Sequence, residues 1–417
     1  MQEPPARERY KVLGLLVILF AITYLDRVCI SVAGPRMQAE LGISPAGWGW
    51  VTGAFTIAYG LFEMPTGMLG DRLGPRRVLT RIVLWWSAFT ALTGSINNYY
   101  VLLATRFLFG MGEAGAFPNA AVVVTRWFPA SQRGTIQGVT LMAAQIGGAL
   151  APLLVVPIQM RYGWRASFFV FGVLGVVWAA VWYRWFRDWP GERHSPEAPA
   201  PRTHEAFPWR AAFSSASVLA MLSIAFCYFY VLSFYHGWIH TFLVKGRGFS
   251  EGFLWLSALP YTLGAGANLA GGAVSDVLVR RLGPKRGRQT LGVTLLTAAG
   301  LFLLAAMVLR DPLLTVLALA AAYGSIGFQQ SGLAAACLDL SPKNAGALMG
   351  LTNTFAQAGA LLGSVLFGYI VQATGNYNAP FVPMAALLFL GALLWLKIDT
   401  SHEIGLVKAE AKQVGVL

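Results

Sequence analysis

The chain has little charge. Only 12% of its 417 residues are Asp, Glu, Lys or Arg, about half the share in a soluble protein, whereas 56% are hydrophobic. This balance excludes an ordinary soluble domain. Cysteine is also scarce, and its three copies lie within apolar stretches, without the spacing of a disulfide framework or a metal site. We therefore expect them to be small packing residues: Cys29, Cys227 and Cys337.

The sequence also lacks a nucleotide-binding loop, a cluster of metal ligands and a nucleophile paired with a base. We therefore predict no enzymatic activity, no cofactor and no metal. The net charge of +13 could indicate a nucleic-acid partner. However, the basic residues lie in short loops between apolar stretches, where they set the orientation of a membrane protein. We expect no nucleic acid among the partners.

What the sequence has in abundance is apolar stretches of about 20 residues, the length that crosses a bilayer. Since a single span satisfies its own backbone hydrogen bonds only as a helix, we predict an all-α integral membrane protein. We expect twelve transmembrane helices, at residues 12–33, 48–68, 78–96, 100–125, 134–158, 165–186, 216–242, 252–273, 289–309, 312–338, 346–371 and 379–398.

The basic residues then fix the topology. Most of the 31 lysines and arginines fall on the same side of the membrane as the N-terminus. This bias predicts cytoplasmic termini and a multi-pass protein of the cell (inner) membrane. The few on the other side are Arg36, Arg161, Arg165, Lys245, Arg247 and Arg310.

A short charged segment occurs twice, each time between two apolar stretches, and predicts two related helix bundles. The first copy is Gly67-Met-Leu-Gly-Asp71-Arg72-Leu-Gly74-Pro-Arg76-Arg77. The looser second copy combines Gly272-Ala-Val-Ser-Asp276 with Leu282-Gly283-Pro284-Lys285-Arg286. We interpret the charges of these segments as gating elements that hold one conformation shut, namely Asp71, Arg72, Arg76, Arg77 and Asp276.

The two bundles are separated by a polar, basic and proline-rich stretch at 187–210, which is typical of a cytoplasmic linker. We expect one six-helix bundle at 1–186. The second is expected at 211–417, which includes a short cytoplasmic tail. A central cavity should lie between the two bundles.

Charged residues inside the spans indicate a functional site, because inserting each of them near the bilayer centre costs about 2.5–3.5 kcal/mol of free energy. Arg27 and Arg106 each lie about six residues below the outer end of a span, or about 9 Å at 1.5 Å per residue. They therefore occupy one layer and predict a cationic site for an anion, since a guanidinium grips a carboxylate with two hydrogen bonds. The alternative for each arginine is a structural pair with a nearby carboxylate, or a side chain that reaches outward.

Two carboxyl groups in the same spans are candidates for proton coupling. Glu113 lies seven residues beyond Arg106, on the same helix face and two turns deeper. A carboxyl group in a dry cavity holds its proton more readily near neutral pH, which makes Glu113 a candidate proton carrier. Asp26 is the second candidate, although it points about 100° away from Arg27 and could instead orient a neighbouring helix.

These segments resemble the major facilitator superfamily, whose signature loop matches the first charged segment at nearly every position. Within it, Tyr24-Leu-Asp-Arg-Val-Cys-Ile-Ser31 and Arg106-Phe-Leu-Phe-Gly-Met-Gly-Glu-Ala-Gly-Ala-Phe-Pro118 resemble two hallmarks of the anion:cation symporter family. The resemblance implies transport of sugar acids or related anions, usually with protons, and function as a monomer. It also supports Asp26 with Glu113 as the proton-coupling pair, and Tyr59 and Asn353 as substrate contacts.

We therefore predict proton-coupled symport of a small organic anion by alternating access. Arg27 and Arg106 bind the carboxylate, and Tyr59, Gln145 and Asn353 contact the uncharged groups. Two alternatives remain open: exchange of an organic anion against phosphate, and a transporter-like membrane sensor. The partners expected are the anion, protons and the lipid bilayer.

Overall fold

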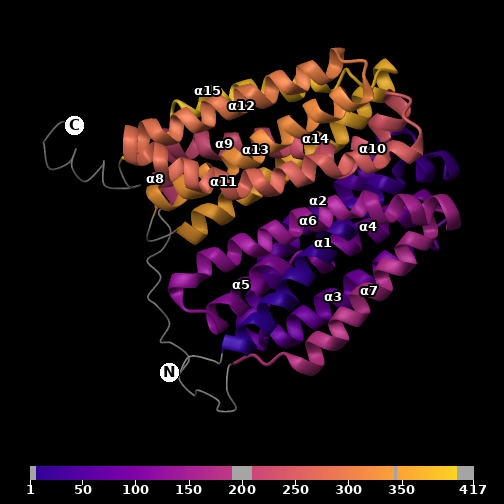
Figure 1. Ribbon diagram of the computed structural model, residues 1–417, viewed down its shortest axis with the longest axis horizontal. Helices are drawn as coiled ribbons and strands as arrows, with labels where there is room; N and C mark the ends of the chain where they lie inside the picture. The colour runs from indigo at the N-terminus through magenta and orange to yellow at the C-terminus, as the bar shows by residue number, and fades with distance from the viewer. Residues whose placement is uncertain (1–5, 190–208, 342–344, 402–417) are drawn as a thin grey trace, which may run out of the picture. The chain divides into compact units, whose positions relative to one another are not determined.

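The computed structural model describes residues 6–189, 209–341 and 345–401. Within these ranges every regular element is a helix and no strand is present (Figure 1). Each of the twelve predicted spans contains a helix, which confirms the all-α fold class. Among the described residues, eight helical segments are long and apolar enough to cross a bilayer, and one of them, Tyr99–Trp127, contains the turn described below. Most of the expected linker, residues 190–208, lies outside the described ranges.

The described residues form two compact units. The first contains the residues up to 189 together with Ser233–Thr262 and Leu361–Ala379. Its complete α-helices are α1 (Ala6–Glu40), α2 (Pro45–Leu73), α3 (Pro75–Thr93), α4 (Tyr99–Glu113), α5 (Ala116–Trp127), α6 (Ala130–Tyr162), α7 (Trp164–Trp185) and α10 (Ile239–Thr241). It also contains a π-helical turn, η1 (Phe242–Gly246), and a 3-10 helix, η2 (Glu251–Ser257).

Three helix pairs organise the first unit: α1 packs along α6, α2 along α4, and α3 along α7 (Figure 1). Its apolar core contains buried residues of α1, α3, α4, α5, α6 and α7. Part of this core is an aromatic stack in which the ring of Trp182 lies 5.1 Å from Trp178 and 3.8 Å from Phe186, centroid to centroid. This core holds α1 and α4 firmly around the charged residues described below.

The second unit contains the described residues of 209–232, Leu263–Ala360 and the chain from Pro380. Its complete helices are α8 (Trp209–Ser214), α12 (Pro284–Val308), α13 (Pro312–Leu340) and α15 (Phe381–Trp395). α12 packs against both α13 and α15 (Figure 1). Three helices contribute to both units: α9 (Ala216–Gly237), α11 (Ala258–Leu282) and α14 (Ala345–Thr374). The division of the chain into bundles 1–186 and 211–417 stays a prediction.

The repeated charged segment produces the same backbone turn in both copies. α2 ends at Leu73, Gly74 has φ +83°, and Pro75 begins α3. α11 ends at Leu282, Gly283 has φ +82°, and Pro284 begins α12. Glycine adopts this left-handed conformation without strain, and proline suits the first helical position because its missing N–H needs no partner there.

One predicted span is interrupted. The stretch expected at 100–125 forms two helices, α4 and α5, separated by a turn at Ala114 and Gly115 directly after Glu113. Gly115 packs tightly against α2, because a Cβ atom there would overlap with the side chain of Thr66. The break therefore places Glu113 at the end of a helix rather than within a continuous one.

Candidate functional site

The charged residues expected to carry function are buried together in the first unit. Asp26 and Arg27 lie near the middle of α1, whereas Arg106 and Glu113 lie on α4. Asp26, Arg106 and Glu113 are buried, and the Arg27 side chain is 14% exposed. Arginine and carboxylate side chains rarely occupy such positions in a membrane helix unless they pair or line a pathway.

Arg27 and Glu113 form an ion pair. Arg27 Nε donates a hydrogen bond to Glu113 Oε1, and Glu113 is 1% exposed at its side chain. This contact is one of the structural alternatives for Arg27. However, the buried atoms Arg27 Nη2 and Glu113 Oε2 have no hydrogen-bond partner among the described residues. The pair therefore leaves one donor and one acceptor unsatisfied.

Aromatic rings surround the Arg27 guanidinium. Its Cζ atom lies 4.5 Å from the ring centroid of Tyr59, 5.2 Å from Phe55 and 5.3 Å from Tyr24. A cation over an aromatic face is stabilised by about 0.5–2 kcal/mol, more when both groups are desolvated. Three rings therefore compensate in part for removing the charge from water, and they fix the guanidinium in one place.

Phe55 of α2 also contacts the second arginine. The Cζ atom of Arg106 lies 5.3 Å from the Phe55 centroid and 4.5 Å from the Phe109 centroid. Arg106 Nε is buried without a hydrogen-bond partner among the described residues. Both arginines thus share one aromatic ring, which keeps the two cations near each other. The sequence did not reveal Phe55, because a phenylalanine in an apolar span carries no signal.

Close approach of α2 and α4 positions this ring. A Cβ atom at Gly110 would lie 2.5 Å from the backbone oxygen of Phe55 and 3.1 Å from its Cα and Cδ2 atoms. Only glycine leaves room for this contact, as expected for small residues at membrane helix interfaces. The sequence run Gly110-Met-Gly-Glu113 therefore brings Phe55 beside Arg106 and also ends α4 at Glu113.

Asp26 is buried without compensation. Its side chain is 2% exposed, and neither carboxyl oxygen has a hydrogen-bond partner among the described residues. Burial of an isolated ionised carboxylate is far more costly than burial of the protonated acid. The environment of Asp26 therefore suits a group that binds and releases a proton.

A histidine also lies beside the arginine site. The ring of His236, on α9, lies 6.1 Å from that of Tyr24, edge to face, and 6.2 Å from that of Tyr261. His236 Nε2 is buried without a hydrogen-bond partner in the described part of the chain. Tyr24 thus contacts both Arg27 and His236, which brings an imidazole nitrogen near the Arg27 guanidinium.

The expected contacts for uncharged groups lie in different places. Tyr59 is buried and packs on Arg27, as described above. Gln145 lies half-buried on α6 of the first unit, and Asn353 lies half-buried on α14 in the part that belongs to the second unit. Tyr59 is thus placed at the arginine site by a direct contact with Arg27, whereas the roles of Gln145 and Asn353 stay predictions.

The first charged segment, where gating is predicted, is bound by an acid that was not expected from the sequence. Asp188 Oδ1 accepts from the backbone N–H of Arg76 at 2.8 Å, and the Arg76 side chain donates to Tyr183 O at 2.9 Å through Nε and at 2.5 Å through Nη2. Arg72 and Arg77 are exposed. The side chain of Asp71 lies outside the described part of the chain, so its gating role stays a prediction. Asp188 follows the sixth span, and no local pattern connects it with α3.

The second charged segment lies beside a buried arginine, and its gating role likewise stays a prediction. Arg288 donates to Ser275 Oγ at 2.5 Å and to Asp339 Oδ2 at 3.2 Å, and its Nη1 lies 3.7 Å from Asp276 Oδ1. Arg288 is 7% exposed, whereas Asp276 is 65% exposed. Asp276 is therefore the outer member of this cluster, and Arg288 is its centre.

The chain belongs to the major facilitator superfamily. The family model of that description matches residues 16–357 and 288–416. Among curated relatives, the chain is 32% identical to the "probable sulfoacetate transporter SauU" of Cupriavidus necator, over 94% of each chain.

Two further relatives come from Bacillus subtilis. The chain is 28% identical to its hexuronate transporter, over 93% of this chain and 94% of the relative. The chain is also 30% identical to the "probable galactarate/D-glucarate transporter GudP" of the same organism, over 92% of this chain and 89% of the relative. These relatives confirm the resemblance to the anion:cation symporter type.

Solved structures share the fold. A bacterial homolog of the human lysosomal transporter Spinster, in an inward-facing and occupied conformation, matches with a TM-score of 0.75 and 18% identity. The match covers 93% of this chain and 96% of the other. A point mutant of the nucleoside transporter NupG matches with a TM-score of 0.74 and 12% identity. The match covers 93% of this chain and 99% of the other. At these identities the likeness supports the fold alone.

Proposed function

We propose that this protein is a secondary active transporter that carries a small organic anion together with protons by alternating access. One observation carries the proposal: two arginines, Arg27 and Arg106, are held against the same aromatic ring inside membrane helices, and each has a buried N–H without a partner among the described residues. Buried polar groups are normally hydrogen-bonded, so unsatisfied ones point to a ligand.

The unsatisfied groups match the chemistry of an anion. Arg27 Nη2, Arg106 Nε and His236 Nε2 are all buried and without a partner among the described residues. A carboxylate or sulfonate offers several acceptor oxygens and a negative charge, so it satisfies donors and charge together. The rings of Tyr24, Phe55 and Tyr59 exclude water around it and strengthen these bonds.

Proton coupling follows from competition for Arg27. In the structure Arg27 pairs with Glu113. An arriving anion and an ionised Glu113 compete for the same guanidinium, so protonation of Glu113 frees Arg27 for the anion. Release of the anion reverses the exchange, because Arg27 then recovers Glu113 as its partner and the proton leaves. Asp26, buried without a partner among the described residues, is the second proton carrier in this scheme.

The names of the relatives support the substrate class. They are described as transporters of sulfoacetate, hexuronate and galactarate or glucarate. All of these are small anions that carry a carboxylate, some with a sulfonate or several hydroxyl groups. Tyr59, Gln145 and Asn353 are the proposed contacts for the uncharged groups. We further propose a monomer in the inner membrane with both termini in the cytoplasm, as the distribution of basic residues indicates.

The test is uptake into proteoliposomes that contain the purified protein. Radiolabelled sulfoacetate, glucuronate and glucarate are supplied with and without an inward proton gradient. We expect the gradient to accelerate uptake of at least one of them. Arg27→Ala and Arg106→Ala should abolish this uptake, whereas Arg161→Ala, the same change at an exposed residue of α6, should not.

Two outcomes would contradict the proposal. If the proton gradient does not change the rate of uptake while counterflow persists, the protein is an exchanger, for example of the anion against phosphate, and not a symporter. Binding without uptake or counterflow would favour a membrane sensor over a transporter.

A further inference from the structure

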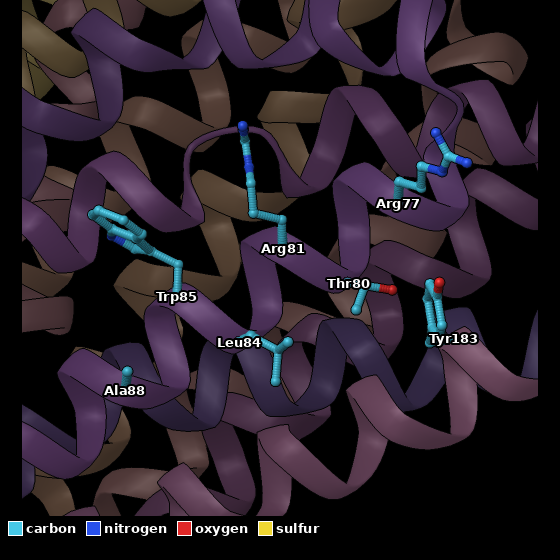
Figure 2. Close-up of a pocket in the computed structure, with 7 residues that line it drawn as sticks. All are labelled: Arg77, Thr80, Arg81, Leu84, Trp85, Ala88 and Tyr183. Carbon is cyan, nitrogen blue, oxygen red and sulfur yellow. The ribbon is translucent and has the colours of Figure 1, made fainter.

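A groove of about 500 Å³ lies on α3 of the first unit, and its lining includes neither Arg27 nor Arg106 (Figure 2). Six of its residues come from α3, and one comes from the end of α7. Figure 2 shows the side chains of Arg77 and Arg81 extending from α3 toward the upper side of the view, with their guanidinium groups diverging. The residues that line it are Arg77, Thr80, Arg81, Leu84, Trp85, Ala88 and Tyr183.

The basic end of this groove is formed by two arginines. Arg77 and Arg81 are both exposed and four residues apart, so they face each other on one side of the helix. Neither forms an ion pair within the described part of the chain, and the groove lining contains no acidic residue. Two like charges at this spacing destabilise a helix unless an anion lies between them.

The rest of the groove is apolar and has fixed walls. Leu84 is 43% exposed and Ala88 is also exposed. The Trp85 indole N–H donates to Leu108 O at 2.8 Å, which holds its ring in place. Tyr183 is held by Arg76, whose Cζ atom lies 4.6 Å from its ring centroid. The walls therefore require little ordering when a ligand enters.

The order of these residues along α3 matches a lipid. Arg77 lies in the first turn of α3, and Trp85 follows about 12 Å further along the axis. A basic helix end followed by an apolar surface corresponds to the headgroup and acyl layers of a membrane, where aromatic residues mark the boundary. Basic pockets at this level bind the headgroups of acidic lipids.

We propose that this groove binds one anionic phospholipid. Its phosphate lies between Arg77 and Arg81, and an acyl chain runs along Leu84 and Ala88 beside the ring of Trp85. This gives Arg77 a role at the lipid surface in place of the gating role expected from its sequence motif. The inference is independent of the transported substrate.

The second copy of the repeat does not reproduce the groove. Aligned on Pro75 and Pro284, the positions of Arg81, Leu84, Trp85 and Ala88 are occupied on α12 by Thr290, Val293, Thr294 and Thr297. Arg77 alone keeps a basic counterpart, Arg286. We therefore expect one such lipid per chain rather than two.

Native mass spectrometry of the purified full chain tests the proposal. Dioleoyl-phosphatidylglycerol and dioleoyl-phosphatidylcholine are titrated, and bound lipid is counted per protein. We expect at least a fivefold preference for the anionic lipid at the first site. The double variant Arg77→Ala/Arg81→Ala should lose this preference. The matched control Arg280→Ala/Arg286→Ala removes the same charge at exposed positions of α11 and α12 and should keep it.

Three results would overturn the proposal. They are an unchanged preference in the Arg77/Arg81 variant, an equal loss in the control, or displacement of the lipid by inorganic phosphate at equal concentration. The last result would make the groove a site for free anions, since an acyl chain that contributes to binding favours the lipid. Leu84→Gln adds an independent test, because it should weaken binding while both arginines remain. Thermal unfolding in lipid-free detergent verifies that each variant is folded.

Discussion

At the scale of single residues, the central feature is one phenylalanine between two arginines. The Phe55 centroid lies 5.2 Å from Arg27 Cζ and 5.3 Å from Arg106 Cζ. The arginines were predictable from the sequence because a charge within an apolar span stands out. Phe55 was not, because it looks like any other apolar residue until the helices are placed. The Arg27–Glu113 pair was one open alternative, and in the proposed mechanism it links anion binding with proton binding.

Replacement of Glu113 by glutamine should uncouple transport from the proton gradient. Glutamine resembles the protonated acid and cannot hold Arg27 as an ion pair, so the arginine stays available to the anion. We expect retained or tighter anion binding, intact counterflow and no acceleration of uptake by a proton gradient. Proteoliposome uptake at several pH values measures this. Glu40→Gln is the control, because Glu40 pairs with Arg165 at an exposed position. Gradient-driven uptake by the Glu113 variant would contradict this role.

His236 should contribute to affinity as a hydrogen-bond donor. His236→Leu removes the unsatisfied Nε2 group, whereas His236→Gln keeps a polar group of similar size. A hydrogen bond to a charged partner contributes about 1.5–3 kcal/mol, so we expect the leucine variant to bind the anion at least roughly tenfold more weakly. The glutamine variant should lose less. Equal affinities of the two variants in a thermal-shift titration would place His236 outside the site.

At the scale of helices, glycines determine how closely α4 approaches its neighbours. Gly110 admits the backbone of Phe55, and Gly115 admits Thr66. Both contacts join α4 and α5 to α2, and the chain turns between them after Glu113. The sequence showed that glycines recur at helix interfaces, but which partner each one meets depends on the tertiary arrangement.

Gly110→Ala should therefore destabilise the protein and impair transport. Its Cβ atom would lie 2.5 Å from a backbone oxygen, which cannot move without shifting α2. Such overpacking costs about 1–3 kcal/mol, so the unfolding temperature should fall. Gly14→Ala on α1 is the matched control, because a Cβ atom there meets nothing within 4 Å. An unchanged unfolding temperature in the Gly110 variant would show that α2 and α4 are further apart.

The sequence identified the helices better than their interruptions. Each of the twelve apolar stretches contains a helix, as predicted. The sequence did not reveal the turn at Ala114 and Gly115, because both residues are compatible with a membrane helix. Neither did it reveal the π-helical turn at Phe242–Gly246 or the 3-10 helix at Glu251–Ser257. These departures arise from packing between distant segments, which local composition does not encode.

At the scale of the whole molecule, the repeated charged segment forms one local structure twice. The same Leu-Gly-Pro turn with positive φ at glycine joins α2 to α3 and α11 to α12. The side chains around it have diverged: Asp188 binds the first turn, whereas Arg288 organises the second. Asp188 and Arg288 were both beyond the reach of the sequence, because their partners lie on other helices.

The proposed orientation predicts which loops face the cytoplasm. The three natural cysteines are buried, so the unmodified chain should not react with an impermeant thiol reagent. In intact cells, Arg310→Cys should react, whereas Arg286→Cys should react only after the membrane is opened. Both arginines are exposed, so access to the reagent depends on the side of the membrane. The reverse labelling pattern would invert the topology.

The most direct test of the central claim is a thermal-shift titration of the purified protein with sugar acids, sulfoacetate and other small carboxylates. We expect at least one of them to stabilise the natural protein and the Arg161→Ala control. Stabilisation should vanish in both Arg27→Ala and Arg106→Ala, since each loses a charge-assisted hydrogen bond with a contribution of about 1.5–3 kcal/mol. Undiminished stabilisation in either variant would show that the anion binds elsewhere.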